Sequence, residues 1–285
     1  MKVLSRLYMG LVFVFLYAPL FIMVLFSFNE ANSLSHFTGF SLKWYEDLFQ
    51  NEEVLDVLSN TLILAVISSL LATVIGTAAA VGIEKMRSRW LKSTVTTVSN
   101  MPMMNPDIVT GISMALLFAF AMKLFGMESI FGFWTVLIAH TTFNLPYVIL
   151  SVIPKIRQMD RHLPEAALDL GCTPLQSFFK VELPAIMPGV LSGLVMSFTL
   201  SLDDFVISYF NTEGDFQTLP IYIFGMTKRT VTPDIYSLST LLFVSVLLLL
   251  ILSNIMQGHA ERKEEMRRRA TAGKARRKKE GGTAK

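Results

Sequence analysis

The sequence predicts an all-α membrane protein with six transmembrane helices, and three observations support this fold class. Hydrophobic residues fill 52% of the 285 positions and charged residues only 16%, whereas soluble domains carry about 25% charged residues. Six stretches are apolar over the length of about 20 residues that a membrane-spanning helix needs. The segments that connect these stretches are alternately rich and poor in lysine and arginine, as the cytoplasmic and external loops of membrane proteins are.

The six predicted spans are Leu7–Phe28, Thr61–Ile83, Thr97–Met122, Phe131–Ile153, Gly189–Phe210 and Tyr236–Met256. The first is too long for the apolar region of a signal peptide, and no small-residue cleavage site follows it, so we expect a retained anchor. In the second span, Gly76 and Ala80 are small residues at the spacing that allows close helix packing. In the third, Pro102 and Pro106 predict a kinked or interrupted helix.

The basic residues predict the orientation of the chain. The ends and loops on one side of the spans hold 21 of the 25 lysines and arginines, which places that side in the cytoplasm. Both termini are therefore expected to be cytoplasmic. Residues 1–258 form the predicted membrane domain. Residues 259–285 form a polar, basic tail, which we expect to be disordered near the anionic lipid surface.

The predicted cytoplasmic loop between the fourth and fifth spans has a distinctive pattern. Pro164 and Glu165 suit the first turn of a short helix, and Ala166 and Ala167 continue it with a small surface. Gly171 can end this helix in a left-handed conformation. Pro174 suits the first turn of a second short helix over 175–183, and Pro184 and Pro188 are expected to break the chain before the fifth span. The loop is thus predicted to be a compact helical hairpin, which on its own could be an ordinary surface feature.

The spacing in this loop resembles the signature of permeases of ATP-binding-cassette importers. That signature is Glu-Ala-Ala, three residues, Gly, nine residues, Ile, one residue and Leu-Pro, and here it differs only in Val181. The resemblance implies the fold of type I importer permeases and a coupling helix that docks on a cytoplasmic ATPase subunit. The ATPase-coupling residues that it implies are Glu165, Ala166, Ala167, Gly171, Leu183 and Pro184.

Catalytic chemistry is not expected on this chain. It lacks the Gly-x-x-x-x-Gly-Lys-Ser/Thr phosphate loop, so ATP is expected to be bound and hydrolysed by a partner subunit. The single cysteine, Cys172, and four scattered histidines offer no metal-binding cluster. We therefore predict a transport subunit, not an enzyme, with no metal and no cofactor of its own.

Acidic residues inside the predicted spans point to the cargo. Asp107 lies in the third span, and Asp203 and Asp204 follow Ser201 in the fifth. Intramembrane carboxylates are costly and usually face a polar path or a partner, so these four residues are predicted to line a path for a cation. Asp203 and Asp204 point about 100° apart on a helix, so one could face the path while the other bonds locally. The alternatives to a cation path are that these acids cap helices or that they relay protons.

Three runs resemble the spermidine/putrescine permeases of this importer class: Asn105–Val109 and Ser197–Phe205 around these acids, and Gly39–Tyr45 in the first external loop. The resemblance covers roughly residues 7–256 and implies polyamine cargo and a location in the bacterial inner membrane. It also implies four partners: a homologous second permease, two ATPase subunits and an external substrate-binding protein. Membrane lipids surround the chain, and nucleic acid is not an expected partner.

Two points stay open from the sequence. Trp44 is either at the external mouth of the path or an aromatic anchor at the membrane interface. The cargo is either a polyamine, with spermidine and putrescine not distinguished, or another substrate of the class, such as thiamine, iron or phosphonate. A proton-coupled secondary transporter is the rival from another class, but it leaves the coupling-loop pattern unexplained.

Overall fold

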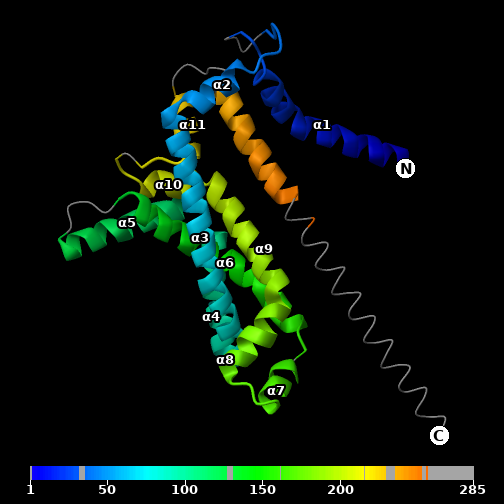
Figure 1. The fold of residues 1–285 in the computed structure, drawn as a ribbon, viewed down its shortest axis with the longest axis vertical. Coiled ribbons are helices and arrows are strands. Elements are labelled where there is room, and N and C mark those ends of the chain that lie inside the picture. The colour runs from blue at the N-terminus through cyan, green and yellow to red at the C-terminus, as the bar shows by residue number, and fades with distance from the viewer. Residues whose placement is uncertain are drawn as a thin grey trace. The chain divides into compact units, whose positions relative to one another are not determined.

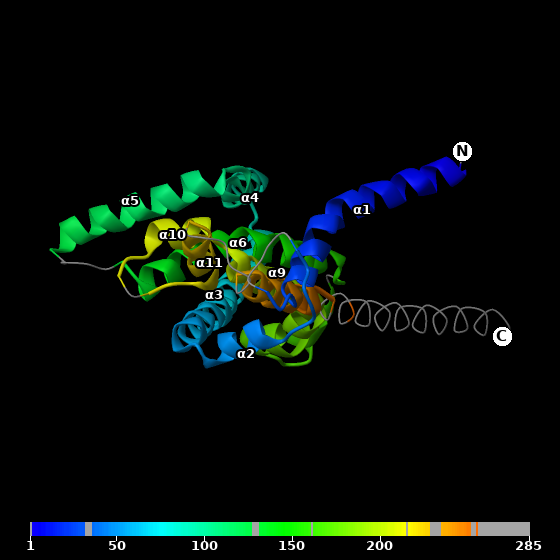
Figure 2. The same cartoon turned by 90° about the horizontal axis from the view of Figure 1, so that it is seen from above.

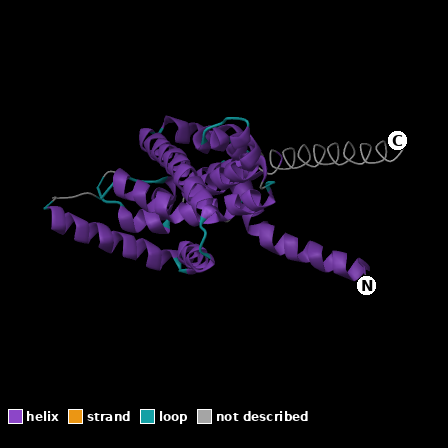
Figure 3. Cartoon of the chain, turned by 90° about the horizontal axis from the view of Figure 1, so that it is seen from below, coloured by secondary structure: helices purple, strands orange, loops and turns teal. Residues whose placement is uncertain are grey.

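A computed structural model describes residues 2–31, 36–126, 131–160, 162–214, 216–228, 235–251 and 255 of the chain. These residues form helices and loops (Figure 3), with one isolated β-bridge between Asn29 and Phe40. The helices are α1 (Lys2–Phe26), α2 (Lys43–Gln50), α3 (Glu52–Lys85), α4 (Arg89–Met104), α5 (Asp107–Phe125), α6 (Phe133–Gln158), α7 (His162–Asp169), α8 (Pro174–Ser177), α9 (Leu183–Asp203), α10 (Val206–Asn211) and α11 (Leu219–Thr227).

Within the described residues, five helical segments are long and apolar enough to cross a membrane, and each overlaps one of the first five predicted spans. They are Leu4–Phe26, Glu52–Lys85, Asp107–Phe125, Phe133–Gln158 and Pro174–Asp203. A shorter apolar helix, Ile235–Ile251, coincides with the predicted sixth span. The last residues of that span, 252–254 and 256, and the predicted tail, 259–285, lie outside the described residues. The predicted boundary at residue 258 therefore stays a prediction.

The predicted third span is two helices and not one (Figure 2). α4 ends at Met104, Asn105 is extended with ψ 143°, and α5 begins at Asp107. Pro106 has no N–H to donate, and it disfavours the helical conformation of the residue before it. The interruption that the prolines predicted is therefore confirmed. Asp107 therefore lies in the first turn of α5 and not in the interior of one continuous helix.

The chain divides into two compact units. The first comprises residues 1–64, 111–136 and 202–247, and the second comprises residues 65–110, 137–201 and 248–285. In the first, Leu48, Val54, Val57, Leu219 and Leu238 form a buried core. Polar bonds supplement it: the backbone N–H of Leu219 donates to the Thr61 hydroxyl at 2.7 Å.

The core of the second unit joins α3, α6 and α9. Ala72, Ala80, Val148, Val152 and Ile186 are among its fully or almost fully buried members. A Cβ on Gly76 would lie 2.8 Å from the Val148 side chain, and one on Gly193 would lie 3.1 Å from the Val148 Cα. The close packing predicted from Gly76 and Ala80 is thus confirmed, because Gly76 has no space for a Cβ and Ala80 is fully buried.

Pro184 and Pro188 do not break the chain before the fifth span, contrary to prediction. α8, a π-helical turn over Phe178–Glu182 and α9 continue as one helical segment, Pro174–Asp203. In the π-helical turn, the N–H of Leu183 donates to the carbonyl of Phe178, five residues earlier. A wider turn relieves the crowding that a proline ring causes on the preceding turn, so the helix continues through Pro184.

Candidate transport path and coupling site

The helical hairpin predicted from the loop pattern is present in the second unit, where α7 and α8 lie at one end of α6 and α9 (Figure 1). The N–H of His162, at the start of α7, donates to the Asp160 carboxylate at 3.0 Å. At the end of α7, Gly171 has φ +86°. Its N–H donates to Leu168 O at 2.9 Å, and the next N–H, of Cys172, donates to Ala167 O at 3.0 Å. This pair of bonds is a Schellman motif, which explains why glycine is needed here.

The second half of the hairpin begins with a capping box. The Thr173 hydroxyl accepts from the N–H of Gln176 at 3.3 Å, and the N–H of Thr173 donates to the Gln176 side chain at 3.1 Å. The Ser177 hydroxyl donates to the carbonyl of Pro164 at 3.3 Å, which ties α8 to α7. Ala167 and Ser177 are both buried where these helices meet. The hairpin therefore has a small core of its own.

The predicted coupling residues are divided between the surface of the hairpin and its core. Glu165, Ala166 and Gly171 are exposed, whereas Ala167 is only 6% exposed. Leu170 and Leu175 add large exposed apolar side chains, at 86% and 71%. Such residues beside a small-residue surface are typical of a protein interaction site. Leu183 and Pro184 lie at the start of α9, and Pro184 is exposed while Leu183 is half-buried.

Replacing Gly171 by valine is expected to loosen the end of α7. A β-branched side chain at φ +86° costs about 1–2 kcal/mol. In the valine variant, the backbone amides at position 171 and at Cys172 should therefore exchange with solvent about 5- to 30-fold faster. Asparagine tolerates the left-handed region, so Gly171→Asn is the matched control and should exchange nearly as slowly as the unmodified protein. Hydrogen exchange with mass spectrometry measures both. Equal protection in the valine variant would contradict this role of Gly171.

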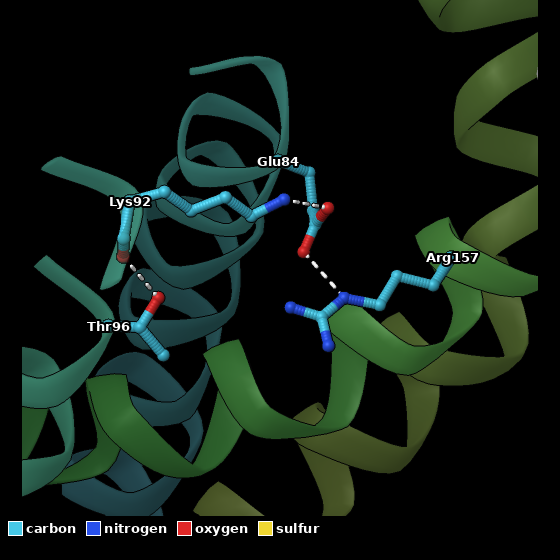
Figure 4. A network of polar contacts seen from close by, with 4 residues as sticks. All are labelled: Glu84, Lys92, Thr96 and Arg157. Atoms are coloured by element: carbon cyan, nitrogen blue, oxygen red, sulfur yellow. Dashed lines mark hydrogen bonds and ion pairs between the residues drawn. The ribbon is translucent and has the colours of Figure 1, made fainter. Parts of the chain in front are cut away.

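A network of ion pairs holds the helix ends beside the hairpin (Figure 4). The Glu84 carboxylate at the end of α3 accepts from Lys92 of α4, and from Arg157 of α6 at 2.8 Å. The neighbouring Lys85 binds Glu182 of the π-helical turn at 2.8 Å. Glu182 is buried, and buried carboxylates need such partners. These ion pairs connect the π-helical turn that follows α8 to α3, and they connect α3 to α4 and α6.

The sequence pattern did not single out this network. Lys85, Lys92 and Arg157 count there only as basic residues that predict the orientation of the chain, and Glu84 and Glu182 have no predicted role. Glu84 follows the second predicted span and Glu182 precedes the fifth, but the same loops also hold Asp160, Glu165 and Asp169, so sequence alone does not distinguish the paired acids from the others. The partners are far apart in the chain, so only the fold could pair them.

Asp203 and Asp204 lie at the break between α9 and α10 in the first unit. The two oxygens of Asp204 accept from the N–H groups of Ile207 at 3.3 Å and Ser208 at 2.8 Å, so this residue caps α10. Asp203 instead lines a pocket of about 360 Å³ together with aromatic and apolar side chains of α11 and the helix Ile235–Ile251. The two acids therefore have different surroundings. The predicted angle of about 100° does not apply to them, because α9 ends at Asp203 and Asp204 lies outside the helices.

Ser201 is not beside these acids in an open path but is buried in the second unit. Its hydroxyl lies 2.7 Å from Nδ1 of His140 and 2.9 Å from the hydroxyl of Ser68. The three residues come from α9, α6 and α3, and all are at most 3% exposed. This arrangement favours a bond between helices over a contact with cargo, so the path role of Ser201 stays a prediction without support from its position.

Asp107 and Trp44 lie on separate units. Asp107 is exposed in the first turn of α5, where its negative charge also suits the positive end of the helix. Trp44 on α2 is half-buried, and its indole N–H donates to the carbonyl of Asn29 at 2.7 Å. Lys43 lies 5.6 Å from the centroid of the Trp44 ring. Trp44 thus fixes the first loop to α2, whichever of its two predicted roles applies.

Comparison with protein families matches residues 72–265 to the model described as "Binding-protein-dependent transport system inner membrane component". The chain is 37% identical over 249 residues to the spermidine/putrescine transport system permease protein PotC of Escherichia coli (strain K12), covering 87% of this chain and 92% of that one. It is 36% identical over 234 residues to the putrescine transport system permease protein PotI of the same strain, covering 82% of this chain and 83% of that one.

Solved structures share the fold. A chain of a bacterial ABC transporter involved in the import of the acidic polysaccharide alginate aligns with a TM-score of 0.70 and 17% identity, over 90% of this chain and 95% of that one. A chain of the MetNI methionine ABC transporter in an inward-facing conformation aligns with a TM-score of 0.57 and 19% identity, over 73% of this chain and 98% of that one. Most of the chain therefore has the fold of these importer permeases.

Proposed function

The chain belongs to the family of binding-protein-dependent transport system inner membrane components, and from this premise we propose that it moves polyamines such as spermidine and putrescine across the inner membrane. It does so as one permease subunit of an ATP-driven importer. The observation that carries the proposal is the exposed surface of the hairpin α7–α8, which bears the Glu-Ala-Ala signature. This surface would be the docking site for the ATPase subunit that supplies the energy.

The hairpin supports a mechanical role because it is connected to the membrane helices. A force on α7 passes to the α8–π-turn segment through the buried contact of Ala167 and the bond between Ser177 and Pro164. From Glu182 the connection continues through Lys85 to α3, and from Glu84 to α4 and α6. ATP bound by a partner would supply the energy, and the exposed residues Glu165, Ala166 and Leu170 would receive the motion. Ala167 would shape this surface from beneath.

A cationic cargo is supported by the acids and by the relatives. The two relatives, PotC and PotI, are named as permease proteins of spermidine/putrescine and putrescine transport systems. Asp203 lines a pocket with aromatic side chains, and a carboxylate beside aromatic faces suits an alkylammonium group. Asp107 would provide a second carboxylate on the path. Weak binding at each acid would let the cargo move on.

The remaining partners and the orientation follow from the same class. We expect a second, homologous permease, two cytoplasmic ATPase subunits and an external binding protein, with both termini of this chain in the cytoplasm. One of the solved alginate transporters is in complex with a substrate-bound periplasmic protein, which supports an external delivery step. The basic ends and loops support the orientation.

Uptake by cells tests the cargo. Cells that lack their own polyamine uptake should accumulate labelled spermidine or putrescine when this chain and its partner subunits are expressed together. Excess unlabelled polyamine should compete, whereas excess thiamine or phosphonate should not. Competition by thiamine or phosphonate alone would contradict polyamine cargo while leaving the importer class in place.

A further inference from the structure

The side-chain ammonium group of Lys228 contacts a cluster of aromatic rings near Asp203. Phe205, Tyr209 and Phe224 form this cluster: the ring centroids lie 4.6 Å apart for Phe205 and Phe224, 5.3 Å for Phe205 and Tyr209, and 6.1 Å for Tyr209 and Phe224. Lys228 Nζ lies 4.6 Å from the Phe224 centroid and 6.0 Å from the Tyr209 centroid. Both distances are within the range of a cation–π contact, which extends to about 6 Å.

The cluster adjoins a space that a small molecule can enter. Phe205 and Phe224 line the same pocket of about 360 Å³ as Asp203, and small-molecule sites begin at about 300 Å³. Three lining residues, Pro220, Ile223 and Leu242, are apolar and suit methylene groups. Phe224 and Tyr209 are 38% and 43% exposed, so their rings are accessible from outside the core.

We propose that the Phe205/Tyr209/Phe224 cluster and Asp203 form a subsite for one ammonium end of the cargo, and that Lys228 is a tethered competitor for its aromatic faces. This inference rests on the proposed polyamine function. The ammonium of Lys228 ends a chain of four methylenes, and so does each end of putrescine, so the two have the same chemistry at the aromatic face. When cargo enters, its ammonium replaces that of Lys228, while its methylenes pack on the apolar lining.

Competition by a tethered group keeps the subsite weak. A cargo ammonium must displace Lys228 before it contacts Phe224, so part of its binding free energy is lost in the exchange. When the cargo leaves, Lys228 takes its place and the aromatic faces are again covered by a cation. A transport path needs binding that is weak enough for release, and this exchange provides it.

The test measures the equilibrium binding of labelled spermidine to the purified permease–ATPase complex in lipid nanodiscs, without binding protein. Lys228→Met removes the ammonium but keeps an apolar stem, and it should lower the Kd about three- to fivefold, the range of a partly exposed cation–π contact. Lys228→Arg keeps a competing cation and should leave the Kd nearly unchanged. An unchanged Kd in Lys228→Met, or no spermidine binding in any variant, would overturn the proposal.

A double variant separates competition at the rings from general charge repulsion. In a Phe224→Leu background, which keeps an apolar side chain but removes the ring, Lys228→Met should give less than half of its effect on the Kd. A full effect in that background would show that Lys228 acts only through its charge at a distance and would overturn the subsite. Spermidine uptake by the unmodified complex tests the proposed function independently, so uptake with no Lys228 effect would refute the subsite alone.

Discussion

The Ala166→Trp variant is expected to lose ATP-driven uptake by about tenfold or more while it still inserts into the membrane and folds. Ala166 is exposed on α7, so a large side chain there adds bulk only to the surface that is proposed to receive the ATPase subunit. A single bulky side chain at the centre of an interface can cost 2 kcal/mol or more, which is about 30-fold in affinity. Uptake into proteoliposomes and co-purification of the ATPase subunit measure the loss.

Two controls make this experiment specific. Ala166→Ser keeps the small surface and should transport normally. Ala167→Trp changes a buried position, so it should also lower the thermal stability of the hairpin, which Ala166→Trp should not. Normal uptake and normal ATPase association in Ala166→Trp would refute docking at this surface.

The second large effect is expected at the break between α9 and α10. Asp203→Asn should reduce polyamine uptake by about tenfold, because an amide cannot replace the charge-assisted bond of a carboxylate to an ammonium. The variant should assemble normally, because Asp203 is exposed and lines a pocket. Uptake of labelled spermidine at a low concentration, with complex assembly measured in parallel, gives the result.

Asp204→Asn is the matched control, since it removes the same charge one residue away. Asp204 accepts one backbone N–H group of α10 at each of its two oxygens. Asparagine keeps only one acceptor oxygen, so the replacement should mainly cost stability, about 1 kcal/mol for the lost hydrogen bond. If Asp204 has a structural role and Asp203 contacts the cargo, the melting temperature should fall in Asp204→Asn but not in Asp203→Asn. If Asp203→Asn takes up spermidine at the normal rate, the cation path does not run past this residue.

The sequence was a good guide to elements that depend on local chemistry. The apolar stretches became helices because a long apolar segment satisfies its backbone only as a helix in the membrane. Gly171 ended α7 in the left-handed region because no Cβ opposes that conformation. The loop pattern located the hairpin because its capping residues lie within a few positions of each other.

Other features depended on contacts between distant residues, and the sequence could not supply them. Pro184 was expected to end a helix, but the π-helical turn before it, whose buried Glu182 pairs with Lys85 of α3, lets the helix continue. Ala167 looked the same as Ala166 in the sequence, and only the packing of α7 on α8 distinguishes them. Ser201 stood next to two acids in the chain, yet the fold directs it to His140 and Ser68.

The source of energy tests the central claim most directly. The permease–ATPase complex, reconstituted into proteoliposomes with its binding protein, should take up labelled spermidine only when ATP is supplied on the side of the ATPase subunits. An uncoupler that dissipates the proton gradient should not reduce this uptake. Uptake that needs the proton gradient and proceeds without ATP would contradict the account and would make the chain a proton-coupled transporter.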